Sequence, residues 1–563
     1  MNLAALVDRI DALAPDHDVL VFPETALSGY FLQGGVSESA RTAEELVEGL
    51  GPPPPEAPDV VVGFYERWRR RLYNSVAWLT PDGDRWSVVH VHRKMFLPTY
   101  GVFDEARFVE AGRVVEPLDT RFGRVGMLIC EELWHSLPAT ILALGGAELL
   151  VVVSATPVRD LTPTAGDGPP RLERWERLAR STAEEHGIFV TVTQLVGSEG
   201  GKLLAGGSLV VGPDGRLLGQ GPLLEEGVVS ASLDGILVER ARVTSPLLSD
   251  LEQMLPHLER SLAGAVEGGR REEDPEGLHG GGGPAALIPV GSDCLAVDPA
   301  LIEDALVRFI RDEVVIRRGF EKVVLGISGG VDSAVSLALA CRALGPENVH
   351  GFRMPYRTSS PDSLAHARLA LEASGAHEHT VEITGVVDAY LEALGPGISP
   401  QQKGNLMARP RAVVLFDRSV ALHALPLGTG NKSERLLGYY TWHADDSPPI
   451  NPLGDLFKTQ VWELARHLEV PAPIVDKPAS ADLIQGVHDE DELGISYPDA
   501  DPILHWLTRG FTAADLVHSG FDPGHVALVE GRLNSTHWKR ELPTVALLSS
   551  SAIGEFYLRP VDY

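Results

Sequence analysis

The chain has 563 residues, of which 44% are hydrophobic and 22% charged, and its 78 acidic against 48 basic residues give a net charge of −30. This composition predicts a globular protein of about two to four domains and excludes a chain that is disordered throughout. The acidic balance argues against general binding of nucleic acid or of an anionic membrane, because both need a positive field. We therefore expect small-molecule substrates, with no nucleic-acid or membrane partner.

The cysteines indicate a reducing compartment. Cys130, Cys294 and Cys341 are odd in number, widely spaced and outside any CxxC or Cys/His zinc spacing, which excludes a disulfide scaffold. No uncharged apolar stretch approaches the roughly 18 residues that a membrane-spanning helix needs. The N-terminal segment 1–18 carries early acidic residues and has the pattern of an amphipathic helix, not of a signal peptide. A cytoplasmic protein is expected.

Residues 1–240 alternate short β-rich runs with helical patterns. Examples are DVLVFPE at 18–24, WSVVHVHRK at 86–94 and RVGMLIC at 124–130. This alternation predicts layered sheets flanked by helices in a first domain over 1–240.

A connector over 241–295 follows, and within it the Gly-, Pro- and charge-rich segment 268–284 is predicted to be a flexible linker.

The period changes after the linker. A helical pattern at 299–318 leads into the strand KVVLGIS at 322–328, a glycine turn and a helix that begins near Ser333. Another strand, VHGFRMP at 349–355, precedes a helix at 361–374. This βαβ succession predicts a doubly wound parallel sheet over 296–563, with ligands at the carboxyl ends of its strands.

Three residues in the first domain form a candidate catalytic set. Cys130 closes one apolar strand, Glu24 stands at the end of another, and Lys94 follows a third. Attack of a thiolate on a carboxamide needs a base for the thiol proton and a cation for the oxyanion. Each residue alone has a plain alternative, a buried structural cysteine or a solvated charge, but the three together favour an amidase.

These segments resemble the nitrilase-type amidases: Glu24 in FPETALSGY, Lys94 in HRKMFLP and Cys130 in GMLICEELWH. The resemblance implies an α-β-β-α sandwich and makes Glu105, in YGVFDEARF, the second glutamate of that family. Glutamine-using members place an amide pocket on residues that correspond here to Tyr30, Tyr100, Glu131, Trp134 and Thr156. Where they carry a lysine after the last of these, this chain has Arg159.

The second candidate site is the loop SGGVDS at 328–333, between a strand and a helix. Small residues let backbone amides close around phosphate oxygens, and the helix N-terminus adds partial positive charge. Asp332 within the loop suits Mg²⁺ bound to phosphates. The loop is not a Walker A motif, because no GK[ST] follows.

The loop resembles that of the pyrophosphatase-type ATP enzymes, which transfer AMP. The later segments GNLMARPR (404–411), LGTGNKSERLLGYYT (427–441) and NPLGDLFKTQVWELA (451–465) resemble NAD synthetases. With the amidase half, the chain is similar to the glutamine-dependent NAD synthetase family over nearly its whole length, linker excepted.

The family resemblance implies roles for individual residues. ATP is expected on Gly326, Ile327, Ser328, Gly329, Gly330, Val331, Asp332, Ser333, Arg353 and Thr429. Mg²⁺ is expected on Asp332 and Glu434, with Lys458 beside the reacting phosphates. The dinucleotide substrate is expected near Asn405, Arg409, Glu434, Asp445 and Lys539. Each could instead be an ordinary surface charge or polar residue.

The implied reaction is the ATP-dependent amidation of nicotinic acid adenine dinucleotide (deamido-NAD) through an adenylate, with ammonia from glutamine. The resemblance also implies a homo-oligomer whose synthetase domains pair. Two alternatives stay open: an ammonia-fed synthetase with an uncoupled amidohydrolase, or a non-catalytic nucleotide-binding paralogue.

Two features depart from the family. Nitrilase-type domains open with a strand before the first helix, whereas Met1 leads almost directly into a helix here, so a sheet strand is expected to be missing. The family also tends to have an acid where this chain has Pro449, which predicts altered substrate contacts with activity retained.

Overall fold

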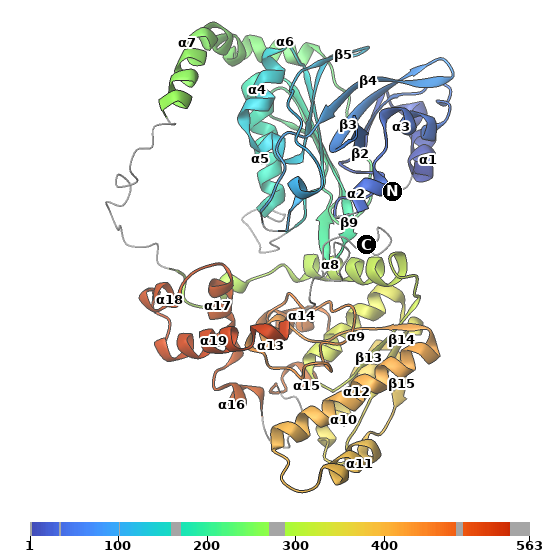
Figure 1. Ribbon diagram of the computed structural model, residues 1–563, viewed down its shortest axis with the longest axis vertical. Helices are drawn as coiled ribbons and strands as arrows, with labels where there is room; N and C mark the ends of the chain where they lie inside the picture. The colour runs from blue at the N-terminus through green and yellow to red at the C-terminus, as the bar shows by residue number, and fades with distance from the viewer. Residues whose placement is uncertain are drawn as a thin grey trace. The chain divides into compact units, whose positions relative to one another are not determined.

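The computed structural model describes residues 3–32, 35–100, 102–158, 170–268, 288–479 and 488–540. These residues divide into two compact units, which we call the N-terminal unit (3–268) and the C-terminal unit (288–540) (Figure 1). Most of the predicted linker, 269–284, lies outside the described residues. Within the described part of the chain, no helix is both long and apolar enough to cross a membrane.

The first sheet of the N-terminal unit has the strand order β1-β2-β3-β4, with β1 parallel to β2 and the other pairs antiparallel. Its strands are β1 (Val19–Val21), β2 (Asp59–Trp68), β3 (Arg71–Asp82) and β4 (Arg85–Arg93). Because side chains alternate along a strand, Val60 and Val62 of β2 pack with Leu6 of α1 (Leu3–Leu13), whereas Val61 belongs to the core of the second sheet. Helix α3 (Ala43–Leu50) packs beside α1.

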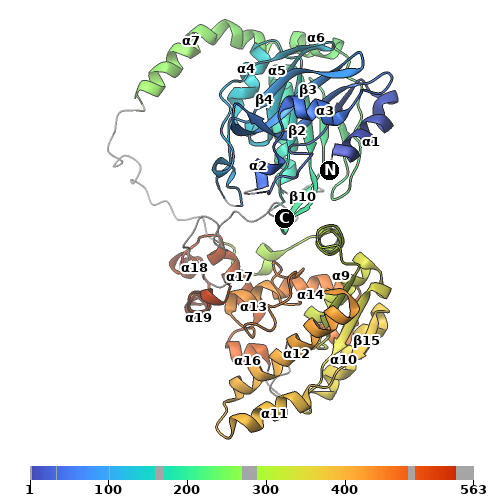
Figure 2. The same cartoon turned by 45° about the vertical axis from the view of Figure 1, so that its right-hand side comes forward.

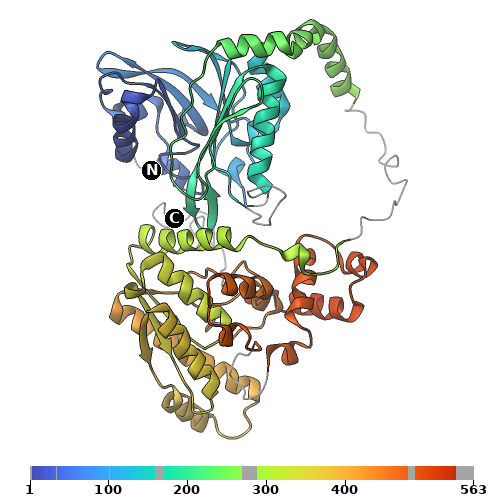
Figure 3. The same cartoon turned by 180° about the vertical axis from the view of Figure 1, so that it is seen from behind.

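The second sheet has the strand order β12-β11-β8-β7-β6-β5. Its strands are β5 (Leu118–Thr120), β6 (Gly123–Ile129), β7 (Leu149–Ser154), β8 (Phe189–Gln194), β11 (Leu209–Val211) and β12 (Leu217–Gln220). Helices α4 (Ser136–Leu144) and α5 (Pro170–His186) pack on it through Leu142, Trp175 and Ala179 (Figures 1 and 3). The predicted α-β-β-α sandwich is confirmed.

Short elements complete the N-terminal unit. A hairpin of β9 (Val196–Glu199) and β10 (Lys202–Ala205) precedes β11, α2 (Val36–Ser39) precedes α3, and α6 (Ile236–Thr244) and α7 (Leu247–Gly268) follow the second sheet. The described first sheet thus has four strands, and the N-terminal segment enters it as a helix followed by a short strand.

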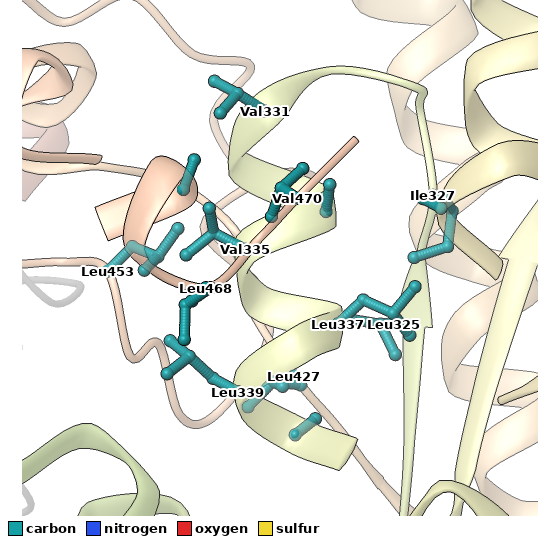
Figure 4. Close-up of a cluster of buried hydrophobic side chains, with 14 of the residues drawn as sticks. Leu325, Ile327, Val331, Val335, Leu337, Leu339, Leu427, Leu453, Leu468 and Val470 are labelled. Carbon is teal, nitrogen blue, oxygen red and sulfur yellow. The ribbon is translucent and has the colours of Figure 1, made fainter. Parts of the chain in front are cut away.

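The C-terminal unit is built on a parallel sheet of order β15-β14-β13-β16. The strands are β13 (Lys322–Gly326), β14 (Val349–Arg353), β15 (His377–Thr380) and β16 (Ala424–Pro426). Val323 and Leu325 of β13 face a core shared with α8 (Pro299–Arg311), α9 (Val331–Leu344), α10 (Pro361–Ser374) and α14 (Lys458–His467), part of which Figure 4 shows. Val324 faces the opposite way.

The other face of the parallel sheet is covered by α11 (Thr384–Leu394) and α12 (Pro400–Leu422), which lie side by side in Figures 1 and 2. Helices on both faces confirm the predicted doubly wound sheet. A further helical cluster packs around Tyr497 and Leu504. It contains α13 (Lys432–Leu437), α16 (Asp489–Leu493), α17 (Tyr497–Thr508), α18 (Ala513–Ser519) and α19 (Pro523–Ser535), and α15 (Ala472–Val475) follows α14.

Candidate active sites

Cys130 lies at the point where β6 ends and a 3₁₀ turn begins. Its φ of 51° is in the left-handed region, which costs a non-glycine residue about 1–3 kcal/mol. The Cys130 Sγ accepts a hydrogen bond from Ser154 Oγ at 3.4 Å and lies 3.8 Å from Thr156 Oγ1. Since β7 runs parallel to β6 and ends at Ser154, the neighbouring strand delivers both hydroxyls to the thiol.

Lys94 follows β4 and is held between two glutamates. Its Nζ lies 2.8 Å from Glu24 Oε1 and 2.8 Å from Glu105 Oε2, and all three side chains are buried. Asn74 Nδ2, on β3, donates to Glu24 Oε1 at 2.7 Å and to Glu105 Oε1 at 2.6 Å. Ala155 N donates to Glu24 Oε2 at 2.7 Å. The structure therefore brings the predicted base, cation and second glutamate into one hydrogen-bonded cluster.

Burial sets the protonation of this cluster. It raises the pKa of Glu24, an effect that the charge of Lys94 opposes. Burial lowers the pKa of Lys94, but the charges of Glu105 and Glu24 outweigh it and raise that pKa well above its usual value. Burial, together with the charge of Glu24, raises the pKa of Cys130 to about 12. The resting thiol is thus protonated near neutrality, and a base must remove its proton before attack.

The predicted amide-pocket residues have three different settings. Thr156 contacts the thiol, and Tyr30 OH donates to Glu105 Oε2 at 2.8 Å. Tyr100 OH donates to Glu131 Oε2 at 3.1 Å, and Tyr100 is exposed. The remaining predicted residue, Trp134, stacks edge-on against Trp175 of α5, with ring centroids 5.7 Å apart. Arg159 lies outside the described residues.

Sequence reasoning missed Asn74 and Ser154. Both are buried polar residues within apolar strands, and each contacts a residue that was predicted. Buried polar groups need partners, so an asparagine inside RLYNSVAWL was the available signal.

The second site begins at the loop between β13 and α9. Ser333 Oγ donates to Gly330 O at 2.9 Å, and Gly330 N donates to Ser328 Oγ at 3.2 Å, which closes the loop on itself. Gly329 has φ 82°, and a Cβ there would stand 2.1 Å from Ser363 O on α10. Only glycine fits this position, because both the backbone conformation and the approach of α10 exclude a side chain.

The loop borders a cavity of about 1040 Å³. The predicted residues that line it are Gly326, Ile327, Ser328, Gly330, Val331, Asp332, Ser333, Asn405, Arg409, Thr429, Glu434, Asp445, Lys458 and Lys539. Arg353 is not brought to the cavity: it pairs with Glu378 and donates to Thr380 Oγ1 at 3.0 Å on β15. Asp446 and Pro448 line the cavity beside the position of Pro449.

Lys458 begins α14 and lies between two acids at the cavity wall. Its Nζ donates to Asp332 Oδ2 and lies 3.7 Å from Glu434 Oε1. Asn431, which was not predicted, donates from Nδ2 to Asp332 Oδ1 at 2.9 Å, and its backbone N donates to Glu434 Oε2 at 3.3 Å. Burial and the charge of Asp332 raise the pKa of Glu434 to about 8. Burial lowers the pKa of Lys458, but Asp332 and Glu434 reverse this, and the net direction is upward.

Three of the residues predicted for the dinucleotide gather around segment 438–445. Asn405 Oδ1 accepts from Thr441 Oγ1 at 3.0 Å, and Asp445 Oδ2 accepts from Thr441 N at 2.8 Å. Lys539 Nζ donates to Gly438 O at 2.9 Å and to Tyr440 O at 3.3 Å. Amide, carboxylate and ammonium groups from three parts of the chain therefore converge on one wall of the cavity.

Comparisons with known proteins match the two units separately. The family model for carbon-nitrogen hydrolase matches residues 2–243, and that for NAD synthase matches residues 302–543. The NH(3)-dependent NAD(+) synthetase of Trichlorobacter lovleyi is 46% identical over 260 residues, which are 46% of this chain and 94% of the relative. That of Chlorobium phaeobacteroides (strain BS1) is 44% identical over 266 residues, 47% of this chain and 95% of the relative.

Two solved structures share the fold over almost the whole chain. The glutamine-dependent NAD+ synthetase from Acinetobacter baumannii, in complex with ADP, has a TM-score of 0.70 and 24% identity, and covers 100% of this chain and 95% of its own. The one from Cytophaga hutchinsonii has a TM-score of 0.65 and 18% identity, and covers 96% and 90%. Fold and sites define a two-part enzyme, a nitrilase-like amidase joined to an ATP-loop nucleotide-binding domain. The chain belongs to the NAD synthase family.

Proposed function

We propose that this enzyme makes NAD from deamido-NAD, ATP and glutamine. The observation that carries the proposal is the Glu24–Lys94–Glu105 cluster beside Cys130 in a chain whose other half belongs to the NAD synthase family. A synthetase fed by free ammonia has no need of a thiol nucleophile with a buried base and cation.

In the N-terminal unit, Glu24 takes the proton of Cys130 as Sγ attacks the carboxamide carbon of glutamine. The ammonium group of Lys94 stabilises the oxyanion. As this adduct collapses, the C–N bond breaks and Glu24 passes its proton to the leaving nitrogen, which departs as ammonia. Water then cleaves the thioester, which gives glutamate and restores the thiol. Glu105 and Asn74 keep Lys94 and Glu24 in place, with Tyr30, Tyr100, Glu131, Trp134 and Thr156 proposed for glutamine binding.

In the C-terminal unit, the carboxylate of deamido-NAD attacks the α-phosphorus of ATP and pyrophosphate leaves. Ammonia then attacks the adenylated carbonyl carbon, and AMP leaves. Amides of the loop 326–333 hold phosphate oxygens, and the Lys458 ammonium faces their negative charge. Asn405, Arg409, Asp445 and Lys539 are proposed to bind the dinucleotide.

The carboxylates of Asp332 and Glu434 fit a hard divalent cation. They line the same cavity and each lies within 4 Å of Lys458 Nζ, while burial and the charge of Asp332 raise the pKa of Glu434. Mg²⁺ prefers carboxylate and phosphate oxygens, and bound there it would neutralise charge on the ATP phosphates. Asp332 and Glu434 are the residues proposed to hold it.

The test is synthesis from two nitrogen sources. We expect glutamate, AMP and NAD to form in equal amounts from glutamine, MgATP and deamido-NAD. Cys130→Ala is expected to abolish synthesis from glutamine and to leave synthesis from ammonium salts. Glutamate release that ignores ATP and deamido-NAD would indicate an uncoupled amidohydrolase. Loss of both activities, or of neither, would contradict the proposal, and nucleotide binding without products would indicate a non-catalytic paralogue.

The C-terminal unit is further proposed to pair with a second copy. Helix α11 exposes Val386, Tyr390 and Leu394, and α12 exposes Val413, Phe416 and Val420, each set at helical spacing on adjacent helices. An exposed apolar face of this kind marks an interface. Val413→Lys with Val420→Lys is expected to lower the mass measured by sedimentation, and an unchanged mass would exclude this face.

Two further expectations remain proposals. The domain boundaries are 1–240, 241–295 and 296–563. A cytoplasmic location is supported by Cys130, Cys294 and Cys341, which form no disulfide among the described residues.

A further inference from the structure

Glu132 is a fully buried carboxylate that the mechanism above does not use. It lies in the 3₁₀ turn that begins at Cys130, and its side chain reaches back to the backbone of Ile129, the residue before that turn. Its Oε2 accepts from Ile129 N at 2.7 Å, and its Oε1 accepts from Met95 N at 2.7 Å. His92 Nε2 lies 2.7 Å from Oε2, so three partners surround one carboxylate.

The two amides belong to the neighbours of the catalytic residues. Ile129 directly precedes Cys130, and Met95 directly follows Lys94. Ile129 ends β6 of the second sheet, whereas His92 lies in β4 of the first sheet. The carboxylate therefore joins the Lys94 segment of one sheet to the Cys130 turn of the other.

We propose that Glu132, with His92, is a positioning residue that fixes the Lys94 ammonium relative to the Cys130 thiol. The inference rests on the proposed amidase function. Lys94 must stand within hydrogen-bond reach of the oxyanion that forms at the carbon attacked by Sγ, so its catalytic value depends on the alignment of two separate sheets. The left-handed φ of Cys130 also has to be held by contacts around the turn, and the Ile129 amide is one of them.

The hydrogen bonds of the Glu132 carboxylate are sensitive to small changes in the side chain. A carboxylate accepts at both oxygens, as these two amides require. Glu132→Gln replaces one acceptor with an NH₂ donor that faces a backbone N–H, and Glu132→Asp shortens the side chain by one methylene. His92→Asn removes the imidazole that contacts Oε2 and keeps both backbone contacts.

The experiment compares glutamine-dependent and ammonium-dependent synthesis in the full-length variants. We expect Glu132→Gln to lower kcat with glutamine by about 10²-fold, with KM for glutamine within about threefold, because misplacement by an ångström has that effect. Ammonium-dependent synthesis is expected to be unchanged. Glu132→Asp should recover part of the loss, and His92→Asn should have a smaller effect.

Asp59→Asn is the matched control. Asp59 is an equally buried carboxylate that accepts from Trp78 Nε1 at 2.9 Å and Thr80 Oγ1 at 2.7 Å, away from the backbone beside Lys94 and Cys130. A general loss of stability would lower the melting temperature and the glutamine-dependent rate of both variants together. The proposal requires that Glu132→Gln lose more activity than Asp59→Asn at equal melting temperature.

A second readout does not depend on glutamine hydrolysis. The rate of alkylation of Cys130 by iodoacetamide, followed on its peptide by mass spectrometry, is expected to change at least fivefold in Glu132→Gln and in Glu132→Asp, and to stay constant in Asp59→Asn. Wild-type protein that releases no glutamate would refute the amidase function alone. Unchanged alkylation and unchanged kcat in the Glu132 variants would overturn the positioning role of Glu132. If Glu132→Gln does not fold, Glu132→Asp and His92→Asn provide the test.

Discussion

Both units hold a buried lysine between two carboxylates, with an asparagine beside them, yet the two clusters differ in what surrounds them. In the N-terminal unit, Lys94 contacts Glu24 and Glu105 at 2.8 Å each. In the C-terminal unit, Lys458 contacts Asp332 closely, whereas Glu434 stands 3.7 Å away at the wall of a cavity of about 1040 Å³.

This difference shows how one set of charges serves two kinds of chemistry. Around Lys94 both carboxylates contact the ammonium group at 2.8 Å and accept from Asn74 Nδ2, so each buried charge has partners, as buried charges require. Around Lys458, Glu434 lies at the wall of the cavity, where burial and the charge of Asp332 raise its pKa to about 8. In the proposed function, the cluster around Lys94 moves protons, and the cluster around Lys458 binds phosphates and a cation.

The largest effect is expected from the loss of the nucleophile, which should stop synthesis from glutamine and leave synthesis from ammonium salts. Cys130→Ala removes the nucleophile, and we expect glutamine-dependent synthesis to fall by more than about 10³-fold. Synthesis from ammonium salts should stay within about twofold of wild type, because the C-terminal cluster is untouched. NAD formation measured with each nitrogen source checks this. A parallel fall with ammonium would mean that the thiol also serves the synthetase site.

Lys458→Met should affect the synthetase site itself. Loss of the ammonium beside Asp332 is expected to lower synthesis from both nitrogen sources by about 10²- to 10³-fold. Lys432→Met is the control, because Lys432 pairs at 2.7 Å with the exposed Asp455. Initial rates of AMP formation measure both variants, and equal rates in the two would refute a role of Lys458 at the phosphates.

The pH dependence of thiol alkylation tests whether the Cys130 thiol is protonated in the resting enzyme. Burial and Glu24 raise the pKa of Cys130 to about 12, so the thiolate fraction should rise about tenfold per pH unit throughout pH 7–9. Iodoacetamide labelling of the resting enzyme, without glutamine, is expected to increase about a hundredfold over this range. A plateau near pH 8 would show that the thiol is already ionised at that pH, and would contradict the raised pKa of Cys130.

The smallest effects are expected from substitution of the two asparagines, Asn74 and Asn431. Asn74→Leu removes one of the two donors that Glu24 and Glu105 share, the other being Lys94, and is expected to lower the glutamine-dependent rate about tenfold, with ammonium-dependent synthesis retained. Asn431→Leu removes the donor to Asp332 and should lower synthesis from both sources by a similar factor. Steady-state rates with each source distinguish the pair. A fall of ammonium-dependent synthesis in Asn74→Leu would contradict a role of Asn74 in the amidase site alone, and unchanged ammonium-dependent synthesis in Asn431→Leu would contradict a role of Asn431 in the synthetase site.

Much of both sites could be predicted from the sequence. Glu24, Lys94 and Cys130 each follow a hydrophobic run, and strand ends are local features that spacing and residue type reveal. The loop 328–333 is equally local, since its glycines and the helix after it lie in one continuous segment. The α-β-β-α sandwich and the doubly wound sheet followed from the same periodicities together with the family resemblance.

The tertiary structure alone decided which side chains meet. The sequence does not show which residues Asn74, Glu132, Ser154 and Asn431 contact in the two sites, because those partners lie on other strands or on distant segments of the chain. Arg353 matched its motif, yet it pairs with Glu378 on the adjacent strand, outside the cavity. The physical reason is that burial and charge compensation depend on how sheets pack: a sequence indicates where a charged residue enters the fold, and the packed neighbours determine whether that charge is neutralised there or left for a ligand.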